Sequence, residues 1–411
     1  MRLLVRNIKE LVQVEEQPRE RVLGTEMANV ATVKDAYLMV EEGRIVAFGP
    51  MATLAEERAD SVVDASGRLV MPCFCDSHTH LVYAGSREHE YCDKIRGLSY
   101  EEIAQRGGGI LNSARRLQAA SEEELYEGAM QRLEQMIRLG SGAVELKSGY
   151  GLTVEAEMKM LRVIRRMKET SPLALKATLL GAHGVPLEYR GRQGEFVDLV
   201  VREMIPQAAA EGLADYVDVF CDRGFFTPEE ADRILEAGAK YGLRGKIHAN
   251  ELACSGGVQV AVRWNALSCD HLEHMGEAEI AALNGSGTMP TVLPGAAFFL
   301  GMPYAPARQM IDSGLGVAMA SDCNPGSSPS GNMQLILSMA CINYRLLPEE
   351  AINAVTLNSA YAMGVSHEVG SIAVGKQANF FITRPVPSLE YMPYSFGENK
   401  VEQVFIQGRR M

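Results

Sequence analysis

The sequence predicts an α/β protein, a (β/α)8 TIM-like barrel with a small β-sandwich domain formed by both chain termini. Between about residue 71 and residue 330, eight short apolar segments that end in polar or glycine-containing loops alternate with stretches of helical periodicity. Both ends of the chain have instead the alternating pattern and the turn residues of β-hairpins. An open, doubly wound sheet is the alternative for the middle of the chain.

The middle of the chain contains the eight predicted strands. They end at His80, Tyr150, His183, Cys221, Glu251, His271, Pro294 and Asp322. A helix candidate before the second strand opens on Ser121, has Glu124 three residues later and closes on Gly140, which is the pattern of a capping box and a C-terminal glycine. Strands and helices in this alternation favour a closed parallel barrel, in which the carboxyl ends of all strands meet at one mouth.

The two ends of the chain predict a second, smaller domain. Residues 36–50 and 400–411 have the pattern of hairpins, with Glu42-Gly43 and Gln407-Gly408 at the turns. Because these segments lie far apart in the sequence, the economical arrangement is one β-sandwich domain built from residues 1–70 and 370–411. The barrel domain then spans residues 71–369.

Composition limits the functions that the chain can have. With 52 acidic against 40 basic residues and a net charge of -12, its surface should repel phosphate backbones and anionic lipid, so we expect no nucleic acid and no membrane partner. The N-terminus lacks the pattern of a signal peptide, and no run of about 18 apolar residues occurs. The scattered cysteines predict reduced thiols, with Cys73 and Cys75 as buried hydrophobes rather than metal ligands. We therefore expect a cytoplasmic protein.

Histidines collect at the predicted strand ends. Five of the eight are in such positions, namely His78, His80, His183, His248 and His271. The spacing of His78 and His80 on an extended backbone points both imidazoles to the same side, as two ligands of one cation require. His248 and Asp322 supply a third nitrogen and an oxygen from other strands. This set predicts one divalent or trivalent metal ion per subunit, zinc or iron.

Two further residues at the same mouth suit catalysis. Glu251 follows His248 by three residues and can face the attacking water as a general base, although a solvated loop carboxylate is the alternative. His271 could donate a hydrogen bond to that water or to a developing oxyanion, and a buried structural histidine is the alternative. A metal ion that activates water and polarises a carbonyl suits the hydrolysis of an unreactive C–N bond.

Several motifs resemble those of the amidohydrolase superfamily. They are P-x-F-x-D-x-H-T-H, HANE, a strand that ends in Asp-His and a terminal SDxNPGSSP. The most specific segments are HTHLVYAGSREHEY, RGGGI, VELKSGYGL, GAHGVP, KIHANE and SDCNPGSSP, and they are similar to one group of these hydrolases over nearly the whole chain. The resemblance implies a single metal ion held by His78, His80, His248 and Asp322, with Glu251 transferring the proton and His271 assisting.

The same resemblance implies how a substrate binds. The residues concerned are Arg87, Tyr100, Tyr150, His183, Asn324, Gly326 and Ser327. Arg87 and Tyr150 would engage a carboxylate and a ring, His183 would contact the ring, and residues 324–327 would form a substrate loop. An arginine fork can bind a carboxylate bidentately, and turn amides can also bind one. We therefore expect a small cyclic amide with a carboxylate tail as the partner molecule, and a homodimer.

Three alternatives stay open. A nucleobase-type aminohydrolase, such as a cytosine or guanine deaminase of the same superfamily, has the same ligand pattern and differs in the substrate residues. A two-metal centre would use a carbamylated Lys147, which comes just before a predicted strand end. A catalytically inactive scaffold that acts by protein association would have lost ligands, whereas every expected ligand and the base are present here.

Overall fold

The barrel is built from parallel strands that follow one another in sequence order. The computed structural model describes residues 1–55, 58–98, 102 and 108–411. The barrel strands are β6 (Phe74–Asp76), β7 (Ser141–Lys147), β8 (Ala174–Ala182), β9 (Tyr216–Cys221), β10 and β11 (Arg244–Gly245 and Ile247–Ala249), β12 (Ser268–His271), β13 (Met289–Val292) and β14 (Ala318–Met319). Because β10 and β11 both pair with β9, they occupy one strand position and leave eight positions among the described residues.

Backbone hydrogen bonds beyond the strand ends join the first barrel position to the last. Thr79 forms a parallel bridge with Cys323, and the His80 N–H donates to the Cys323 carbonyl at 2.9 Å. The Asp322 N–H donates to the His78 carbonyl at 3.0 Å. The predicted barrel is therefore confirmed, and the open-sheet alternative is wrong.

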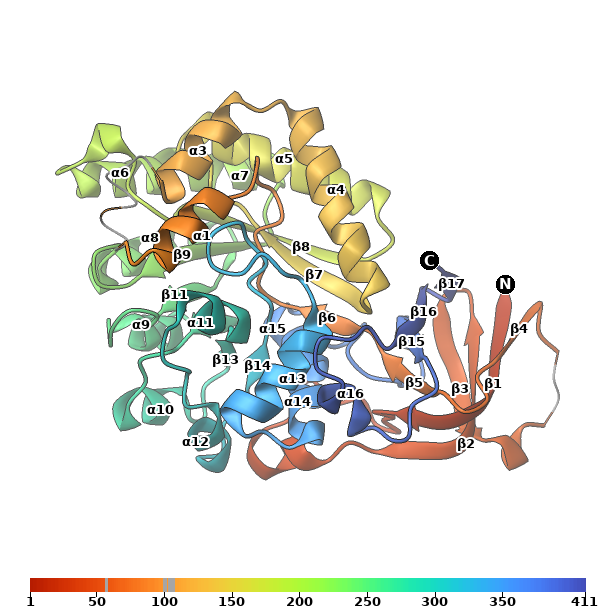
Figure 1. Cartoon of the computed structure of the whole chain (residues 1–411). Helices are drawn as coiled ribbons and strands as arrows, with labels where there is room; N and C mark the ends of the chain where they lie inside the picture. The colour runs from red at the N-terminus through yellow and green to blue at the C-terminus, as the bar shows by residue number, and fades with distance from the viewer. Residues whose placement is uncertain (56–57, 99–101, 103–107) are drawn as a thin grey trace.

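Helices surround the strands, as Figure 1 shows. They are α1 (Glu88–Ile95), α3 (Ile110–Ala119), α4 (Glu122–Arg138), α5 (Val154–Thr170), α6 (Gln193–Leu199), α7 (Ile205–Ala210), α8 (Pro228–Lys240), α9 (Gly257–Arg263), α10 (Glu277–Leu283), α11 (Pro294–Leu300), α12 (Ala307–Asp312), α13 (Met333–Tyr344), α14 (Pro348–Val355) and α15 (Leu357–Ala362). A π-helical segment, Val200–Met204, connects α6 to α7. Apolar side chains of both layers, such as Leu146 of β7 and Ile164 of α5, meet in one core. None of the described helices is long and apolar enough to cross a bilayer.

The start of α4 has the predicted capping box. The Ser121 hydroxyl accepts from the Glu124 N–H at 3.2 Å, and the Glu124 carboxylate accepts from the Ser121 N–H at 2.8 Å. The helix ends at Arg138, and Gly140 follows with a φ of 102°, which favours glycine. Local sequence therefore fixes both ends of the helix that leads into β7.

The cap predicts a stability effect that leaves the site untouched. Replacing Ser121 by alanine removes one side of the capping box, so we expect the free energy of unfolding to fall by about 1 kcal/mol. Urea denaturation followed by circular dichroism measures the change. Ser121→Asp retains a capping oxygen and serves as the control. Equal midpoints for the alanine and wild-type proteins would show that the cap contributes nothing.

Both chain termini contribute to a second sheet beside the barrel (Figure 1). Its strands are β1 (Arg2–Val12), β2 (Thr32–Glu41), β3 (Arg44–Pro50), β4 (Ser61–Asp64), β5 (Leu69–Pro72), β15 (Phe380–Thr383), β16 (Val401–Ile406) and β17 (Arg409–Arg410). The antiparallel pair of β5 and β15 joins the N-terminal strands to the C-terminal ones. Short helical turns lie at Gly24–Ala28, Met51–Thr53, Leu187–Tyr189 and Tyr391–Tyr394 (α16).

The terminal sheet curls over its own core. Ile45 of β3 and Phe405 of β16 belong to one buried cluster although their strands lie near opposite ends of the sheet order. Phe380 and Phe405 stack in this cluster with ring centroids 4.8 Å apart. Both predicted hairpin turns are present, since Glu42 and Gln407 have φ values of 49° and each precedes a left-handed glycine. The domain boundaries at residues 70 and 370 stay a prediction.

Candidate active site

A cavity of about 1010 Å³ opens at the carboxyl ends of the barrel strands. Every described residue that the sequence assigns to substrate binding lines it, namely Arg87, Tyr150, His183, Glu251, Asn324, Gly326 and Ser327. The wall also includes His80, His248, His271 and Asp322. Tyr100, the remaining candidate, lies outside the described residues. The barrel mouth therefore gathers the residues that the sequence placed at the ends of separate strands.

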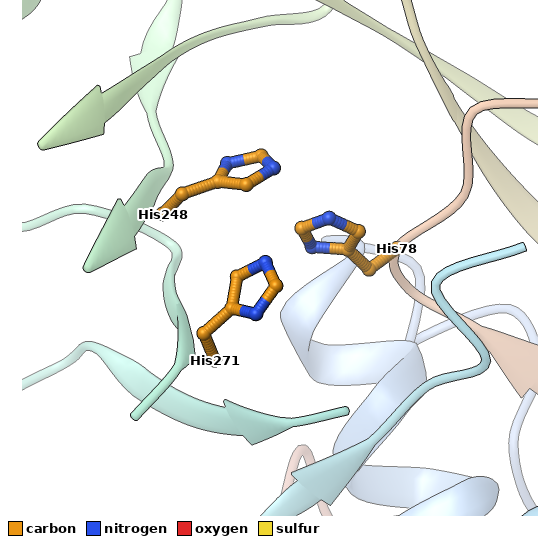
Figure 2. Close-up of side chains that lie close together, drawn as sticks. All are labelled: His78, His248 and His271. Carbon is orange, nitrogen blue, oxygen red and sulfur yellow. The ribbon is translucent and has the colours of Figure 1, made fainter. Parts of the chain in front are cut away.

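The predicted metal ligands come together around His78. The Nε2 atoms of His78 and His80 each lie 3.6 Å from Asp322 Oδ1. One ligand atom from each of these three residues lies within 4.8 Å of the others, and the same holds for His78, His248 and His271. Figure 2 shows the rings of the second group, which come from three segments and face one another. The four predicted ligands and His271 thus form one buried cluster.

The donor atoms of this cluster suit a metal ion. His78 Nε2 and His248 Nε2 are buried, and neither has a hydrogen-bond partner among the described residues. Buried polar atoms are nearly always paired, so unpaired nitrogens that surround one space indicate a missing partner. Three imidazoles and a carboxylate are ligands that zinc and iron both accept. The residues present therefore fit a single cation.

Two buried aspartates contact the far sides of the ligand rings. Asp270 Oδ2 lies 2.6 Å from His78 Nδ1, and Asp218 Oδ2 lies 3.0 Å from His248 Nδ1. A carboxylate in this place fixes the tautomer and the orientation of a metal-binding imidazole. Sequence reasoning missed both aspartates. The available signal was a charged residue inside an apolar strand, at YVDVFC and at SCDH.

Lys147, which a two-metal centre would carbamylate, is paired with carboxylates inside the barrel. Its Nζ donates to Glu145 Oε1 and to Asp218 Oδ2, each at 2.7 Å, and the side chain is fully buried. Burial opposes its charge, but Asp218 and Glu145 outweigh that effect and raise the pKa of Lys147 above its usual value. A carbamate in this place would add a negative charge beside carboxylates. The surroundings of Lys147 therefore do not suit the carbamate that a two-metal centre requires.

The loop after β11 places Glu251 in the cavity wall. Asp222 Oδ2 accepts hydrogen bonds from the backbone N–H groups of Glu251 at 2.7 Å and of Leu252 at 2.9 Å. Asn250 turns the chain with a left-handed φ of 58°, and its side chain donates to the His274 carbonyl at 2.7 Å. Burial raises the pKa of the Glu251 carboxyl above its usual value. A carboxylate with a raised pKa is better able to take up and return a proton near neutral pH.

His271 lies between two carboxylates. Its Nδ1 is 3.7 Å from Glu251 Oε2 and 3.8 Å from Glu273 Oε2. Burial alone would lower the pKa of His271, but these carboxylates raise it to about 10. The residue has a φ of 83°, in the left-handed region that costs energy for any side chain with a Cβ. The His271 ring thus lies between two carboxylates and shares the cavity wall with Glu251.

Arg87 is fixed at the other side of the cavity. Its Nε donates to Glu90 Oε2 at 2.7 Å, and the same carboxylate oxygen accepts from the Gly109 N–H at 3.1 Å. The guanidinium packs against Gly326, where a Cβ would clash with Nη1. Because Glu90 binds the Nε edge, the Nη1 end of the guanidinium faces the loop of residues 324–327. The glycine at 326 is therefore required for the close approach.

The loop at residues 324–327 is held by its own side chains. Asn324 Oδ1 accepts from the N–H groups of Gly326 at 2.7 Å and of Ser327 at 2.8 Å. The Ser327 hydroxyl donates to Asp322 Oδ2 at 3.0 Å, which connects the loop to the predicted metal ligand Asp322. The predicted substrate loop and the predicted metal site are therefore parts of one hydrogen-bonded unit.

His183 and Tyr150 form an aromatic wall beside His80. The rings of His183 and His80 stack at 5.2 Å, and those of His183 and Tyr150 lie 5.3 Å apart. His183 Nδ1 donates to the Gly149 carbonyl at 3.0 Å, and burial lowers the pKa of this histidine to about 3. A neutral imidazole therefore faces the cavity. Sequence reasoning missed the other lining side chains, among them Lys94, Phe220, Arg223, Phe225 and Phe299.

Comparison with known proteins agrees with this geometry. The model of the amidohydrolase family matches residues 69–411, so the chain belongs to that family of hydrolases. An imidazolonepropionase of Flavobacterium johnsoniae is 53% identical over 406 residues, which are 99% of this chain and 99% of the relative. An imidazolonepropionase of Geobacillus kaustophilus is 42% identical over 412 residues, with 99% and 97% covered. Within the family, the chain is an imidazolonepropionase relative over its whole length, and the resemblance inferred from its motifs is confirmed.

Solved structures share the fold at much lower identity. An adenosine deaminase from Xanthomonas campestris with bound zinc has a TM-score of 0.70 and 18% identity, with 99% of this chain and 92% of that chain covered. A mutant atrazine chlorohydrolase from Arthrobacter aurescens TC1, complexed with zinc and atraton, has a TM-score of 0.72 and 16% identity, with 99% and 94% covered. These structures support the barrel and its terminal sheet.

Proposed function

We propose that the chain hydrolyses 4-imidazolone-5-propanoate to N-formimidoyl-L-glutamate, a step of histidine degradation. The supporting observation is a single cavity in which a buried His/Asp cluster and Glu251 lie at one side and the Arg87 guanidinium at the other. That arrangement suits a reactive ring joined to a carboxylate tail. The names of the full-length relatives support the same reaction.

The proposed metal centre consists of His78, His80, His248 and Asp322, with one zinc or iron ion. When bound, such an ion would polarise the carbonyl of the substrate and lower the pKa of the attacking water, so that both reacting groups are prepared for hydrolysis. The support is the unpaired, buried Nε2 atoms of His78 and His248, together with Asp322 Oδ1, which lies 3.6 Å from Nε2 of both His78 and His80. A homodimeric state and a cytoplasmic location stay predictions from the sequence.

The side chains of the cavity account for the remaining parts of the reaction. Glu251 takes the proton of the attacking water and returns it to the ring nitrogen as the C–N bond to the carbonyl carbon breaks. His271 donates a hydrogen bond to the oxygen on which negative charge develops. Tyr150 and His183 pack against the ring, while Arg87 and the loop of residues 324–327 bind the carboxylate tail.

Turnover of the purified protein tests the proposal. Incubation with 4-imidazolone-5-propanoate should consume the substrate and yield N-formimidoyl-L-glutamate without release of ammonia. Cytosine, guanine and adenosine serve as controls because deamination of any of them releases ammonia. Ammonia from a nucleobase, with the imidazolone unchanged, would replace this proposal with the aminohydrolase alternative.

Removing the charge of Arg87 should weaken substrate binding more than it slows the reaction. In Arg87→Met the tail loses charge-assisted hydrogen bonds worth about 1.5–3 kcal/mol, so we expect KM to rise by roughly 10- to 100-fold. Steady-state kinetics separates KM from kcat. Arg192→Met, which removes an exposed arginine paired with Glu195, is the control. An unchanged KM in Arg87→Met would remove this residue from the binding site.

A further inference from the structure

Five charged side chains fill the barrel interior next to the proposed metal ligands. They are Glu145, Lys147, Asp218, Lys246 and Asp270, and each is 0% exposed. Lys147 connects the three carboxylates, since its Nζ lies 2.7 Å from Glu145 Oε1, 2.7 Å from Asp218 Oδ2 and 3.7 Å from Asp270 Oδ2, and Lys246 joins the cluster through Glu145. Replacement of buried ion pairs by apolar residues is often neutral or stabilising. Stability alone therefore does not account for a cluster of this kind.

The cluster contacts the ligand histidines through two shared oxygens. Asp270 Oδ2 lies 2.6 Å from His78 Nδ1, and the same oxygen lies 3.7 Å from Lys147 Nζ. Asp218 Oδ2 lies 3.0 Å from His248 Nδ1 and accepts from Lys147 as well. Each aspartate thus stands between the ammonium and one imidazole. The opposite nitrogen of each ring, Nε2, is buried and has no partner among the described residues.

We propose that Lys147 is a positioning residue for the metal centre. Its ammonium holds Asp270 where it accepts the Nδ1–H of His78, and it holds Asp218 at 3.0 Å from His248 Nδ1. Each ring then directs Nε2 toward the ion. One side chain on β7 thereby orients His248 of β11 and His78 beyond β6. The inference rests on the metal site of the proposed function and does not depend on the substrate. Carboxylates that contact metal-binding imidazoles commonly set the affinity for the metal.

The test is the affinity of the full-length chain for Zn²⁺ alone, measured by competition with a chelator. Lys147→Met removes the ammonium. The double variant Lys147→Gln/Glu145→Gln removes one positive and one negative charge, so the net charge of the cluster stays the same and both aspartates beside the histidines are retained. Lys376→Met is the matched control, because Lys376 is a second deeply buried lysine and donates instead to Ser371 Oγ at 2.7 Å. Circular dichroism of the zinc-free proteins shows which of them are folded.

We expect zinc affinity to fall by about 10- to 100-fold in both Lys147 variants and to stay within about threefold of wild type in Lys376→Met. If Lys147→Met does not fold, the charge-balanced double variant decides. Unchanged affinity in that folded double variant, or an equal loss in Lys376→Met, overturns the inference. If wild-type protein binds zinc but leaves the imidazolone intact, the proposed function fails, and the variant affinities still decide the role of Lys147. If it binds neither zinc nor iron, both fail.

Discussion

The Glu251→Gln variant should lose about 10²- to 10⁴-fold in kcat and keep its metal ion. Glutamine has the same shape and can occupy the same place in the loop, because Asp222 holds that loop through backbone N–H groups at 2.7 and 2.9 Å. The amide cannot accept and return a proton. The loss should therefore appear in kcat, with little change in substrate affinity.

Metal content and substrate affinity, measured together with kcat, distinguish the loss of a general base from the loss of the metal ion or of substrate binding. Metal analysis of the purified variant should give the wild-type stoichiometry, and a substrate analogue should bind with wild-type affinity. Glu277→Gln, an exposed carboxylate at the start of α10, is the control and should behave as wild type. A Glu251→Gln variant with normal turnover would remove the general base from the proposed mechanism. A variant without metal would show that Glu251 acts on the metal site instead.

Sequence patterns predicted the barrel because each of its signals is local. Alternating apolar strands, a capping box at Ser121 and turn residues at Glu42-Gly43 depend on neighbours within a few positions, and the structure has all of them. The convergence of His78, His80, His248 and Asp322 then followed from one geometric rule, that parallel strands in a barrel present their carboxyl ends at one mouth.

The inner charge cluster could not be predicted in the same way. Lys147 and Asp270 are 123 positions apart in the sequence, so only the closed ring of strands brings Nζ to 3.7 Å from the carboxylate. Glu90 presents the same difficulty. Its carboxylate accepts a hydrogen bond from Arg87, but it belongs to the short helix α1, which has no buried residues. The sequence of such a helix does not distinguish this glutamate from an ordinary surface residue. In both cases, side-chain partners depend on packing distances that a linear pattern does not contain.

Asp322→Asn should lose the metal with little change in backbone structure. Asp322 has a φ of 52°, a left-handed conformation that asparagine also adopts readily, and asparagine can still accept the Ser327 hydroxyl bond that is 3.0 Å long in the structure. What changes is the charge of the oxygen that lies 3.6 Å from both His78 Nε2 and His80 Nε2. We therefore expect zinc affinity to fall by more than about 100-fold. This exceeds the loss that is typical when a residue that only hydrogen-bonds to a metal ligand is replaced.

Turnover in Asp322→Asn should fall in proportion to metal occupancy, and added zinc should restore part of it. Asp215→Asn is the matched control, since Asp215 is a half-buried carboxylate at the opposite end of β9 and pairs with Lys168 at 2.8 Å. That variant should lose some thermal stability and no metal. Full metal content and full activity in Asp322→Asn would contradict its role as a ligand. Full metal content with lost activity would place Asp322 in proton transfer instead, because its carboxylate lies in the same cavity wall as Glu251 and His271.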